Sequence, residues 1–178
     1  MFKKSPLAPA RFPVLARVVG VRVSGIAAGL KESGRPDLFF AEFVKGSTVA
    51  GVFTQSKCSS APVDWCRSIL KNGRIRGLVV NSGNANAFTG EEGLIACKEK
   101  ALALASIFKC DKKNIFFAST GVIGEKLPYR RIIQHLNYLK ENLSSSGLKA
   151  ASNAILTTDL KPKSYASKFK INNELFTV

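Results

Sequence analysis

The stretch that decides the fold reads Gly-Leu-Val-Val-Asn-Ser-Gly-Asn-Ala-Asn-Ala-Phe-Thr-Gly and covers residues 77–90. It joins a short apolar run, typical of a buried strand, to a loop rich in asparagine and glycine. Residues 115–124, Ile-Phe-Phe-Ala-Ser-Thr-Gly-Val-Ile-Gly, repeat this plan. Both strands are expected to bring small residues to one edge of a sheet. Because N–H groups and hydroxyls at such an edge can hold negative charge, we interpret it as part of an active site.

Strands and helices are predicted to alternate along the chain. Short apolar runs between turn residues predict strands at residues 18–23, 38–44, 48–53, 78–81 and 114–118, and a hairpin at residues 165–178 that turns at Asn172-Asn173. The runs at 38–44 and 48–53 are expected to pair as a hairpin. Helical periodicity predicts helices at residues 61–70, from residue 89 to about residue 109, from Pro128, and around Leu148, Ala151 and Ile155. This order predicts one α/β domain over residues 17–178, preceded by a proline-rich extended arm at residues 1–16.

The helix that follows residue 89 has a capping-box signature. Thr89 and Glu92 have the spacing at which each side chain bonds to the backbone N–H of the other residue. The apolar face of this helix is predicted to contain Leu94, Cys97, Ala101, Leu104, Ala105 and Phe108.

The composition is that of a globular protein with an unusual charge. The chain has 178 residues, of which 46% are hydrophobic, and a formal net charge of +15. The positive charge is spread over both halves of the chain, without the dense stripe or interleaved aromatic residues of a nucleic-acid surface. It either favours carboxylate ligands in general or only maintains solubility. No apolar run approaches the roughly 20 residues of a membrane span.

Cysteine and histidine usage argues against a metal site. The four cysteines have no Cys-x-x-Cys spacing, and His135 is the only histidine, so zinc is not expected. Four cysteines in such a chain fit a reduced, cytoplasmic protein. No acidic residue precedes Glu32, which resembles a transit peptide, but three prolines within residues 6–13 would interrupt a targeting helix.

Three motifs carry candidate chemistry, and each has a purely structural alternative. In Ser119-Thr120-Gly121, a hydroxyl and an N–H can stabilise the oxyanion of an acyl-transfer intermediate, or Gly121 can simply supply a positive φ to a turn. Residues 81–86 either cradle an anion or build a turn with their asparagine side chains. Thr157-Thr158-Asp159 either caps a helix or binds a substrate. His135, on a helix, is interpreted as a structural residue.

Together, these segments resemble one family. The segments are Ala50-Gly-Val-Phe-Thr54, Ala61-Pro62-Val63, residues 79–90, residues 118–124 and Thr157-Thr158-Asp159. In this order they resemble the ArgJ family of glutamate N-acetyltransferases, also called ornithine acetyltransferases. Phe88 and Leu156 depart from the family pattern, because they stand where the family often has Cys and Met.

The resemblance implies a four-layer αββα sandwich, shared with certain aminopeptidases, and a cytoplasmic enzyme of arginine biosynthesis. Family members move an acetyl group from N-acetylornithine to glutamate. No cofactor is implied, although some members also use acetyl-CoA as a donor. The precursor cuts itself between Ala and Thr, and the new N-terminal Thr of the β chain forms an acetyl-enzyme. The family suggests an α2β2 heterotetramer, with neither nucleic acid nor membrane as a partner.

By position, Thr120 and Gly121 match the oxyanion-hole pair of the family, and Thr157 matches a substrate-binding threonine. The family continues with a glycine-rich stretch that bears a substrate-binding lysine, and then with the cleavage pair, which these residues lack. The chain is therefore expected to be most of an α chain, inactive alone because the nucleophile is absent. An inactive truncated fragment, suggested by the apolar end at residues 175–178, and a basic nucleic-acid-binding protein are the alternatives.

Overall fold

The computed structural model describes residues 6, 15, 17–159 and 161–178, so the arm predicted at residues 1–16 lies almost entirely outside the described residues. The elements follow in the order β1 (Val21–Ile26), β2 (Leu38–Phe43), α1 (Ala61–Ile69), η1 (Leu70–Asn72), β3 (Gly77–Asn84), α2 (Gly90–Phe108), η2 (Lys112–Asn114), β4 (Ile115–Val122), α3 (Tyr129–Gln134), α4 (Leu136–Glu141), α5 (Leu148–Ala154), β5 (Lys168–Ile171) and β6 (Glu174–Thr177). The predicted α/β class is confirmed. Within the described residues, no helix combines the length and the apolarity that crossing a membrane requires.

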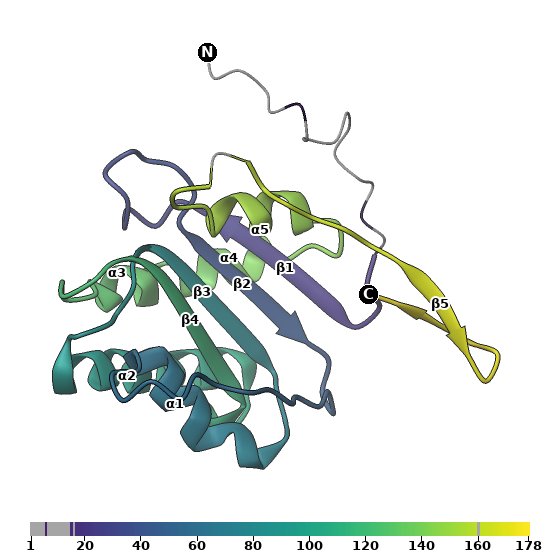
Figure 1. The fold of residues 1–178 in the computed structure, drawn as a ribbon, viewed down its shortest axis with the longest axis horizontal. Helices are drawn as coiled ribbons and strands as arrows, with labels where there is room; N and C mark the ends of the chain where they lie inside the picture. Colours follow the sequence, from purple (N-terminus) through teal and green to yellow (C-terminus); the bar gives the residue numbers. More distant parts are fainter. Residues whose placement is uncertain (1–5, 7–14, 16, 160) are drawn as a thin grey trace.

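A four-stranded sheet with the order β1-β2-β3-β4 forms the centre of the fold (Figure 1). β1 and β3 both pair antiparallel with β2, whereas β4 pairs parallel with β3. A parallel pair needs a long crossover connection, and α2 supplies it. Because β3 and β4 run in the same direction, their carboxyl ends meet at one edge of the sheet, as the sequence predicted. We call this edge, residues 81–86 and 119–124, the carboxyl edge.

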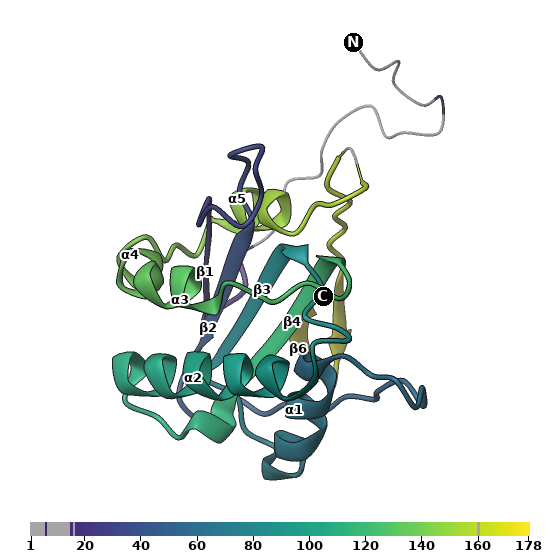
Figure 2. The ribbon, with the colours of Figure 1, turned by 90° about the vertical axis from the view of Figure 1, so that its left-hand side faces the viewer.

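Helices α2, α3 and α4 cover one face of the sheet (Figure 2). Side chains alternate between the two faces of a strand, and those that point toward these helices are the most deeply buried. The sheet side of this core contains Leu38, Phe40, Val79, Ile115 and Phe117, and the helix side contains Cys97, Leu104, Ile132, Leu136 and Leu139. Burial of one such large side chain contributes roughly 1.5–3 kcal/mol, so this layer holds the carboxyl edge in place.

Helix α5 packs on the opposite face, over β1 and β2. Val23 and Ala41 of the sheet pack there against Ala151 of the helix. The approach is close, because a Cβ added to Gly25 would lie 2.6 Å from the carbonyl oxygen of Ala150. Glycine in β1 therefore allows α5 to lie against the sheet.

Helix α1 covers the outer edge of β4. The indole Nε1 of Trp65 donates to the carbonyl oxygen of Ile115 at 2.9 Å. The Cys66 thiol donates to the carbonyl oxygen of Phe117 at 3.2 Å and accepts from its N–H at 3.3 Å. These contacts satisfy backbone groups that an edge strand would otherwise leave open to another chain.

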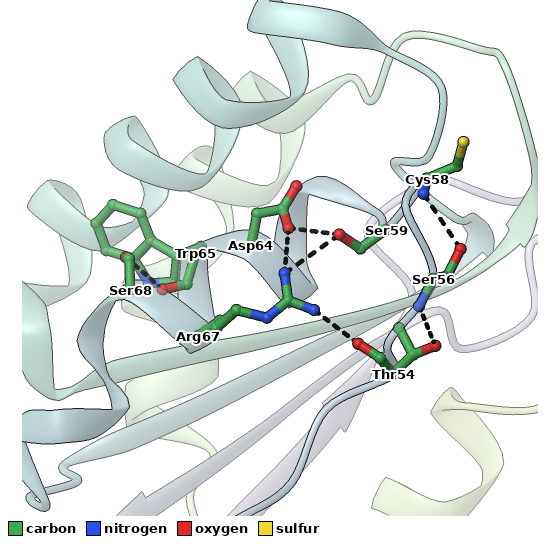
Figure 3. Close-up of polar contacts among 8 residues, drawn as sticks. All are labelled: Thr54, Ser56, Cys58, Ser59, Asp64, Trp65, Arg67 and Ser68. Carbon is green, nitrogen blue, oxygen red and sulfur yellow. Dashed lines mark hydrogen bonds and ion pairs between the residues drawn. The ribbon is translucent and has the colours of Figure 1, made fainter.

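The hairpin predicted for residues 38–44 and 48–53 is wrong. β2 pairs with β1 and β3 instead, and residues 49–60 form an irregular loop. Arg67 of α1 holds this loop (Figure 3), donating to the Asp64 carboxylate at 2.7 Å and to the carbonyl oxygen of Thr54 at 2.9 Å. The apolar residues that suggested a strand, Val49 and Phe53, pack against the core from the loop.

The capping box predicted for α2 is also wrong. The Thr89 hydroxyl donates to the side-chain oxygen of Asn86 at 3.0 Å, and the Glu92 carboxylate pairs with Lys126 at 2.8 Å. The buried face of α2 passes through Gly93, Ala96, Cys97, Lys100, Ala101 and Leu104. Leu94, predicted to face inward, is 44% exposed. Gly93 instead packs closely against Ala61 and Asn86, so the side of α2 that contains Gly93 faces the core.

The predicted C-terminal hairpin is confirmed. β5 and β6 pair antiparallel, and Asn172 and Asn173 have φ angles of 47° and 65°. Two successive positive φ angles define a type I′ turn, which asparagine tolerates. The rings of Phe169 and Phe176 stack with centroids 5.6 Å apart, and the hairpin forms a sheet of its own.

Candidate functional site

The backbones of β3 and β4 approach each other closely at the carboxyl edge. Ser82 lies in register with Thr120, and Gly83 lies in register with Gly121. A Cβ added to Gly121 would lie 2.3 Å from the carbonyl carbon of Gly83. Gly121 also has a φ of 134°, a conformation that other residues rarely adopt. Gly121 therefore has the positive φ of the structural alternative, although it lies within β4 and not in a turn, and only glycine fits at this position.

The asparagines of the carboxyl edge shape the loop itself. Asn81 is fully buried, and its amide donates to the carbonyl oxygen of Asn84 at 2.8 Å while its side-chain oxygen accepts from the Ser119 hydroxyl at 2.6 Å. The N–H of Asn86 donates to the side-chain oxygen of Asn84 at 2.8 Å, and the φ of Asn86 is 46°. These bonds support the turn-building interpretation of residues 81–86.

The Thr120 side chain lies on the face of the sheet opposite to the one that α2, α3 and α4 cover. In-register residues of a parallel pair project to the same side, so the Thr120 side chain projects to the same side as that of Ser82. Thr120 is half-buried and Gly121 is exposed. The hydroxyl of one and the N–H of the other therefore belong to a part of the carboxyl edge that a small molecule can reach.

The end of α5 is tied to this same face. The buried Ser82 hydroxyl donates to the carbonyl oxygen of Ala154 at 2.6 Å. The Lys31 ammonium donates to the carbonyl oxygen of Leu156 at 2.5 Å. Carbonyl groups at the end of a helix have no partner within the helix, so both contacts satisfy acceptors there. Thr157, which follows Leu156 directly, is exposed, and these two contacts hold the segment that leads to it.

Sequence reasoning missed a buried carboxylate behind the site. Asp37 is fully buried, and its carboxylate accepts from the N–H groups of Ala28 at 2.7 Å, Leu30 at 2.7 Å and Lys31 at 3.0 Å. Its own carbonyl oxygen accepts from the N–H of Ser82 at 2.8 Å. An acidic residue directly before a strongly apolar strand was the available signal, because a charge buried there needs several donors.

Lys31 itself is held against the carboxyl edge. A Cβ added to Gly83 would lie 3.0 Å from Cγ of Lys31, so the lysine stem packs on the backbone of β3. Burial lowers the pKa of the Lys31 amine, while the Asp37 carboxylate opposes this shift and Arg35 adds to it. Lys31 thus joins Asp37 as a residue that contacts the candidate site and that the sequence did not reveal.

His135 and three of the four cysteines, Cys66, Cys97 and Cys110, have structural surroundings, whereas Cys58 is exposed. His135 lies at the junction of α3 and α4, where its Nδ1 is 2.8 Å from the carbonyl oxygen of Arg131. Burial raises the pKa of the Cys66, Cys97 and Cys110 thiols, which disfavours reactive thiolates. The structural interpretation of His135 is consistent with this placement.

Comparison with known proteins gives a consistent result. The sequence profile described as "ArgJ family" matches residues 22–178. The arginine biosynthesis bifunctional protein ArgJ of Gluconobacter oxydans is 47% identical over 174 residues, which cover 97% of this chain and 41% of the relative. The corresponding ArgJ protein of Bradyrhizobium diazoefficiens is 45% identical over 174 residues, which cover 98% of this chain and 42% of the relative.

Solved structures agree. The crystal structure of ornithine acetyltransferase from Mycobacterium tuberculosis, complexed with ornithine, matches with a TM-score of 0.78 and 34% identity, covering 83% of this chain and 81% of that chain. The ArgJ structure from Bacillus halodurans matches with a TM-score of 0.81 and 31% identity, covering 90% and 84%. The fold is thus of the type found in ArgJ and ornithine acetyltransferase.

The chain spans about two fifths of the length of the curated relatives it matches. The match nevertheless includes the carboxyl edge and all of the four-stranded sheet except Val21, the first residue of β1, since it runs from residue 22 to residue 178. On sequence and on structure, the chain belongs to the ArgJ family.

Proposed function

We propose that this chain is the α-chain portion of a bifunctional ornithine acetyltransferase and N-acetylglutamate synthase of arginine biosynthesis. The enzyme transfers the acetyl group of N-acetylornithine to glutamate through an acetyl-threonine intermediate. A β chain of the same precursor supplies that threonine. Membership of the ArgJ family and the likeness to an ornithine acetyltransferase solved with ornithine support this chemistry.

In the proposed reaction, this chain contributes the oxyanion hole. The threonine hydroxyl of the β chain adds to the acetyl carbonyl carbon, and the carbonyl oxygen becomes an oxyanion that accepts hydrogen bonds from the Thr120 hydroxyl and the Gly121 N–H. Collapse breaks the amide bond, releases ornithine as the amine and leaves the acetyl ester. The amine of glutamate then adds to the ester carbonyl carbon, and the same donors stabilise the second oxyanion. Its collapse breaks the C–O bond to the threonine, releases N-acetylglutamate and restores the threonine hydroxyl. The N-terminal amine of the β chain takes the hydroxyl proton in the first addition, passes it to the departing ornithine amine, and returns a proton from the glutamate amine to the threonine oxygen.

One observation carries this assignment. Gly121 is pressed against Gly83 in a conformation reserved for glycine, which fixes Thr120 and Gly121 at the carboxyl edge. Fixed donors are effective in catalysis because they need no reorganisation when charge develops. The Ser82 hydroxyl ties α5 to the same face, which supports the role of Thr157 in binding the acetyl donor.

The lengths of the relatives support a divided precursor. This chain covers 81% and 84% of the two solved chains but only 41% and 42% of the two curated sequences. The solved chains are thus far shorter than the curated sequences, as expected when a precursor is cut into two. We extend the proposal to a cytoplasmic α2β2 heterotetramer that needs no cofactor, with acetyl-CoA as an additional donor substrate where it is used.

The test is to isolate this chain from its native host and to measure intact masses of everything that co-purifies. We expect a second polypeptide that begins with Thr, together with transfer of labelled acetyl from N-acetylornithine to glutamate. Recovery of the 178-residue chain alone, without acetyl transfer, would contradict the proposal and favour an inactive fragment.

A further inference from the structure

We infer that Lys31 is a positioning residue for the acetyl-donor site, which fixes Thr157 beside Thr120 and Gly121. The inference rests on the proposed function for the role of Thr157. The placement of Lys31 rests on contacts of this chain alone.

The loop that carries Lys31 is held in place by the buried carboxylate of Asp37. The Asp37 carboxylate accepts from three successive parts of this loop, the N–H groups of Ala28, Leu30 and Lys31, at 2.7 to 3.0 Å. Hydrogen bonds to a charged, buried acceptor are among the stronger ones in proteins. The backbone of Lys31 is therefore fixed relative to the sheet before its side chain makes any contact.

The Lys31 side chain then crosses from this loop to the end of α5. Its stem packs on the backbone of Gly83, the residue in register with Gly121. Its ammonium donates to the carbonyl oxygen of Leu156 at 2.5 Å and to that of Pro36 at 3.1 Å. One side chain thus contacts Gly83 at the carboxyl edge and Leu156, the residue that directly precedes Thr157.

The position of the residues that follow α5 depends on contacts with other parts of the chain. The helix ends at Ala154, and the Leu156 N–H donates to the carbonyl oxygen of Asn153 at 3.4 Å, a long bond. Ser82 holds the carbonyl oxygen of Ala154, and Lys31 holds that of Leu156. Of these two, the Lys31 contact lies closer to Thr157 in the sequence, so its loss should release Thr157 while α5 stays in place.

A positioning role predicts a specific kinetic effect. If Thr157 binds the donor equally in the ground state and the transition state, its misplacement raises KM and leaves kcat unchanged. Misplacement of about 1 Å can cost roughly 100-fold. We expect Lys31→Met to raise KM for N-acetylornithine roughly 10- to 100-fold, with kcat changed less than about threefold.

The experiment uses this chain co-expressed with its β chain and forms a double-mutant cycle of Lys31→Met and Thr157→Ala. We expect the double variant to have the KM of Thr157→Ala alone, because both changes remove one interaction. Lys31→Arg keeps the positive charge and the donors, so it should recover most of the affinity. Lys149→Met, an exposed lysine on α5, is the matched control and should behave as wild type.

Hydrogen–deuterium exchange of the chain gives a readout that does not depend on activity. In Lys31→Met, the peptide that covers residues 152–159 should exchange at least about threefold faster, whereas peptides from β3 should not change. Lys31→Gln, which keeps part of the stem and an uncharged NH2 donor group, provides a second variant if Lys31→Met folds poorly.

Three results are decisive. Unchanged exchange at residues 152–159 would overturn the inference, and so would KM effects of Lys31→Met and Thr157→Ala that multiply in the double variant. If the wild-type complex transfers no acetyl group, the proposed function fails. Faster exchange at residues 152–159 would in that case still show that Lys31 holds the segment around Leu156. Only the role of this contact in catalysis would then be refuted.

Discussion

Gly83 and Gly121 are in direct backbone contact across two parallel strands: a Cβ on Gly121 would lie 2.3 Å from the carbonyl carbon of Gly83 and 2.5 Å from the nitrogen of Asn84. No side-chain movement can relieve such an overlap, because the obstructing atoms are backbone. The pair therefore fixes the separation of the strand ends that carry the proposed oxyanion donors.

Replacing Gly121 by alanine should destabilise the chain. The new methyl group would overlap Gly83, and the φ of 134° is unfavourable for alanine, so we expect a loss of about 2 kcal/mol or more in the free energy of unfolding. Urea denaturation followed by circular dichroism measures it. Gly124→Ala is the control, because Gly124 also has a positive φ of 84° but no atom of the described residues within 4 Å of an added Cβ, and should cost about 1 kcal/mol. Equal losses in the two variants would refute the steric explanation.

Replacing Ser82 by alanine should loosen α5. The variant leaves the carbonyl oxygen of Ala154 without its buried donor, the Ser82 hydroxyl, which donates to it at 2.6 Å in the wild type. An unsatisfied buried acceptor costs about 1–3 kcal/mol, and we expect a loss in that range by urea denaturation. Ser152→Ala is the control, because the Ser152 hydroxyl makes only an exposed bond to the carbonyl oxygen of Lys149 at 2.9 Å, and it should stay within about 0.5 kcal/mol of wild type. A wild-type stability for Ser82→Ala would show that α5 does not depend on this contact.

Replacing Asp37 by asparagine should disturb the loop that carries Lys31. An amide presents an N–H group where the carboxylate accepts from the Leu30 and Lys31 N–H groups, so we expect a loss of about 2–3 kcal/mol. Thermal melting and urea denaturation measure it. Asp111→Asn is the comparison, since Asp111 accepts from the Lys113 N–H at an exposed turn and should matter much less. Equal small effects would mean that the burial of Asp37 has no energetic consequence.

Lys100 should destabilise the fold in a pH-dependent way. It is fully buried over the ring of Phe117, 4.5 Å from the centroid, and its ammonium has no hydrogen-bond partner among the described residues. Burial lowers its pKa from the ordinary 10.5, against the opposing effects of Cys97 and Cys66. Between the lowered pKa and 10.5, the unfolded chain binds the extra proton, so stability rises with pH across that window.

Lys100→Met should remove this pH dependence. We expect the variant to be more stable than wild type near neutral pH by at least about 1 kcal/mol, with the difference shrinking as pH rises. Urea denaturation at several pH values tests it, with the exposed Lys98→Met as control. Burial raises the pKa values of the Cys66 and Cys97 thiols and Lys100 opposes that rise, so the difference is read below about pH 8, where these thiols are protonated in the folded and the unfolded chain. A difference that is constant with pH would contradict the assignment.

The sequence predicted the fold well where a segment had a clear local pattern, such as a short apolar run or a known turn motif. The apolar runs before Asn81 and before Ser119 became β3 and β4, and Asn172-Asn173 formed the expected turn. The residues at 48–53 misled because alternation alone does not show whether a partner strand is available. Thr89 and Glu92 had the correct spacing for a capping box, but tertiary partners, Asn86 and Lys126, took both side chains.

The candidate site was predictable only in part. Thr120, Gly121 and Thr157 lie in recognisable motifs, so the sequence pointed to them. Lys31 and Asp37 lie in an unremarkable polar loop, and their roles depend on contacts with Leu156, 125 positions from Lys31, and with the strand end at Ser82. Long-range contacts of this kind leave no local periodicity, which is why sequence patterns did not reveal them.

The most direct measurement is the kcat for acetyl transfer from N-acetylornithine to glutamate by the reconstituted α and β chains. It compares the wild-type enzyme with the Thr120→Ser and Thr120→Ala variants. Loss of one oxyanion donor slows acyl transfer roughly 10²- to 10³-fold, so Thr120→Ala should fall by that factor at unchanged fold stability. Thr120→Ser keeps the hydroxyl and should retain most of the rate. A Thr120→Ala enzyme that turns over at the wild-type rate would show that this chain does not supply the oxyanion hole through Thr120.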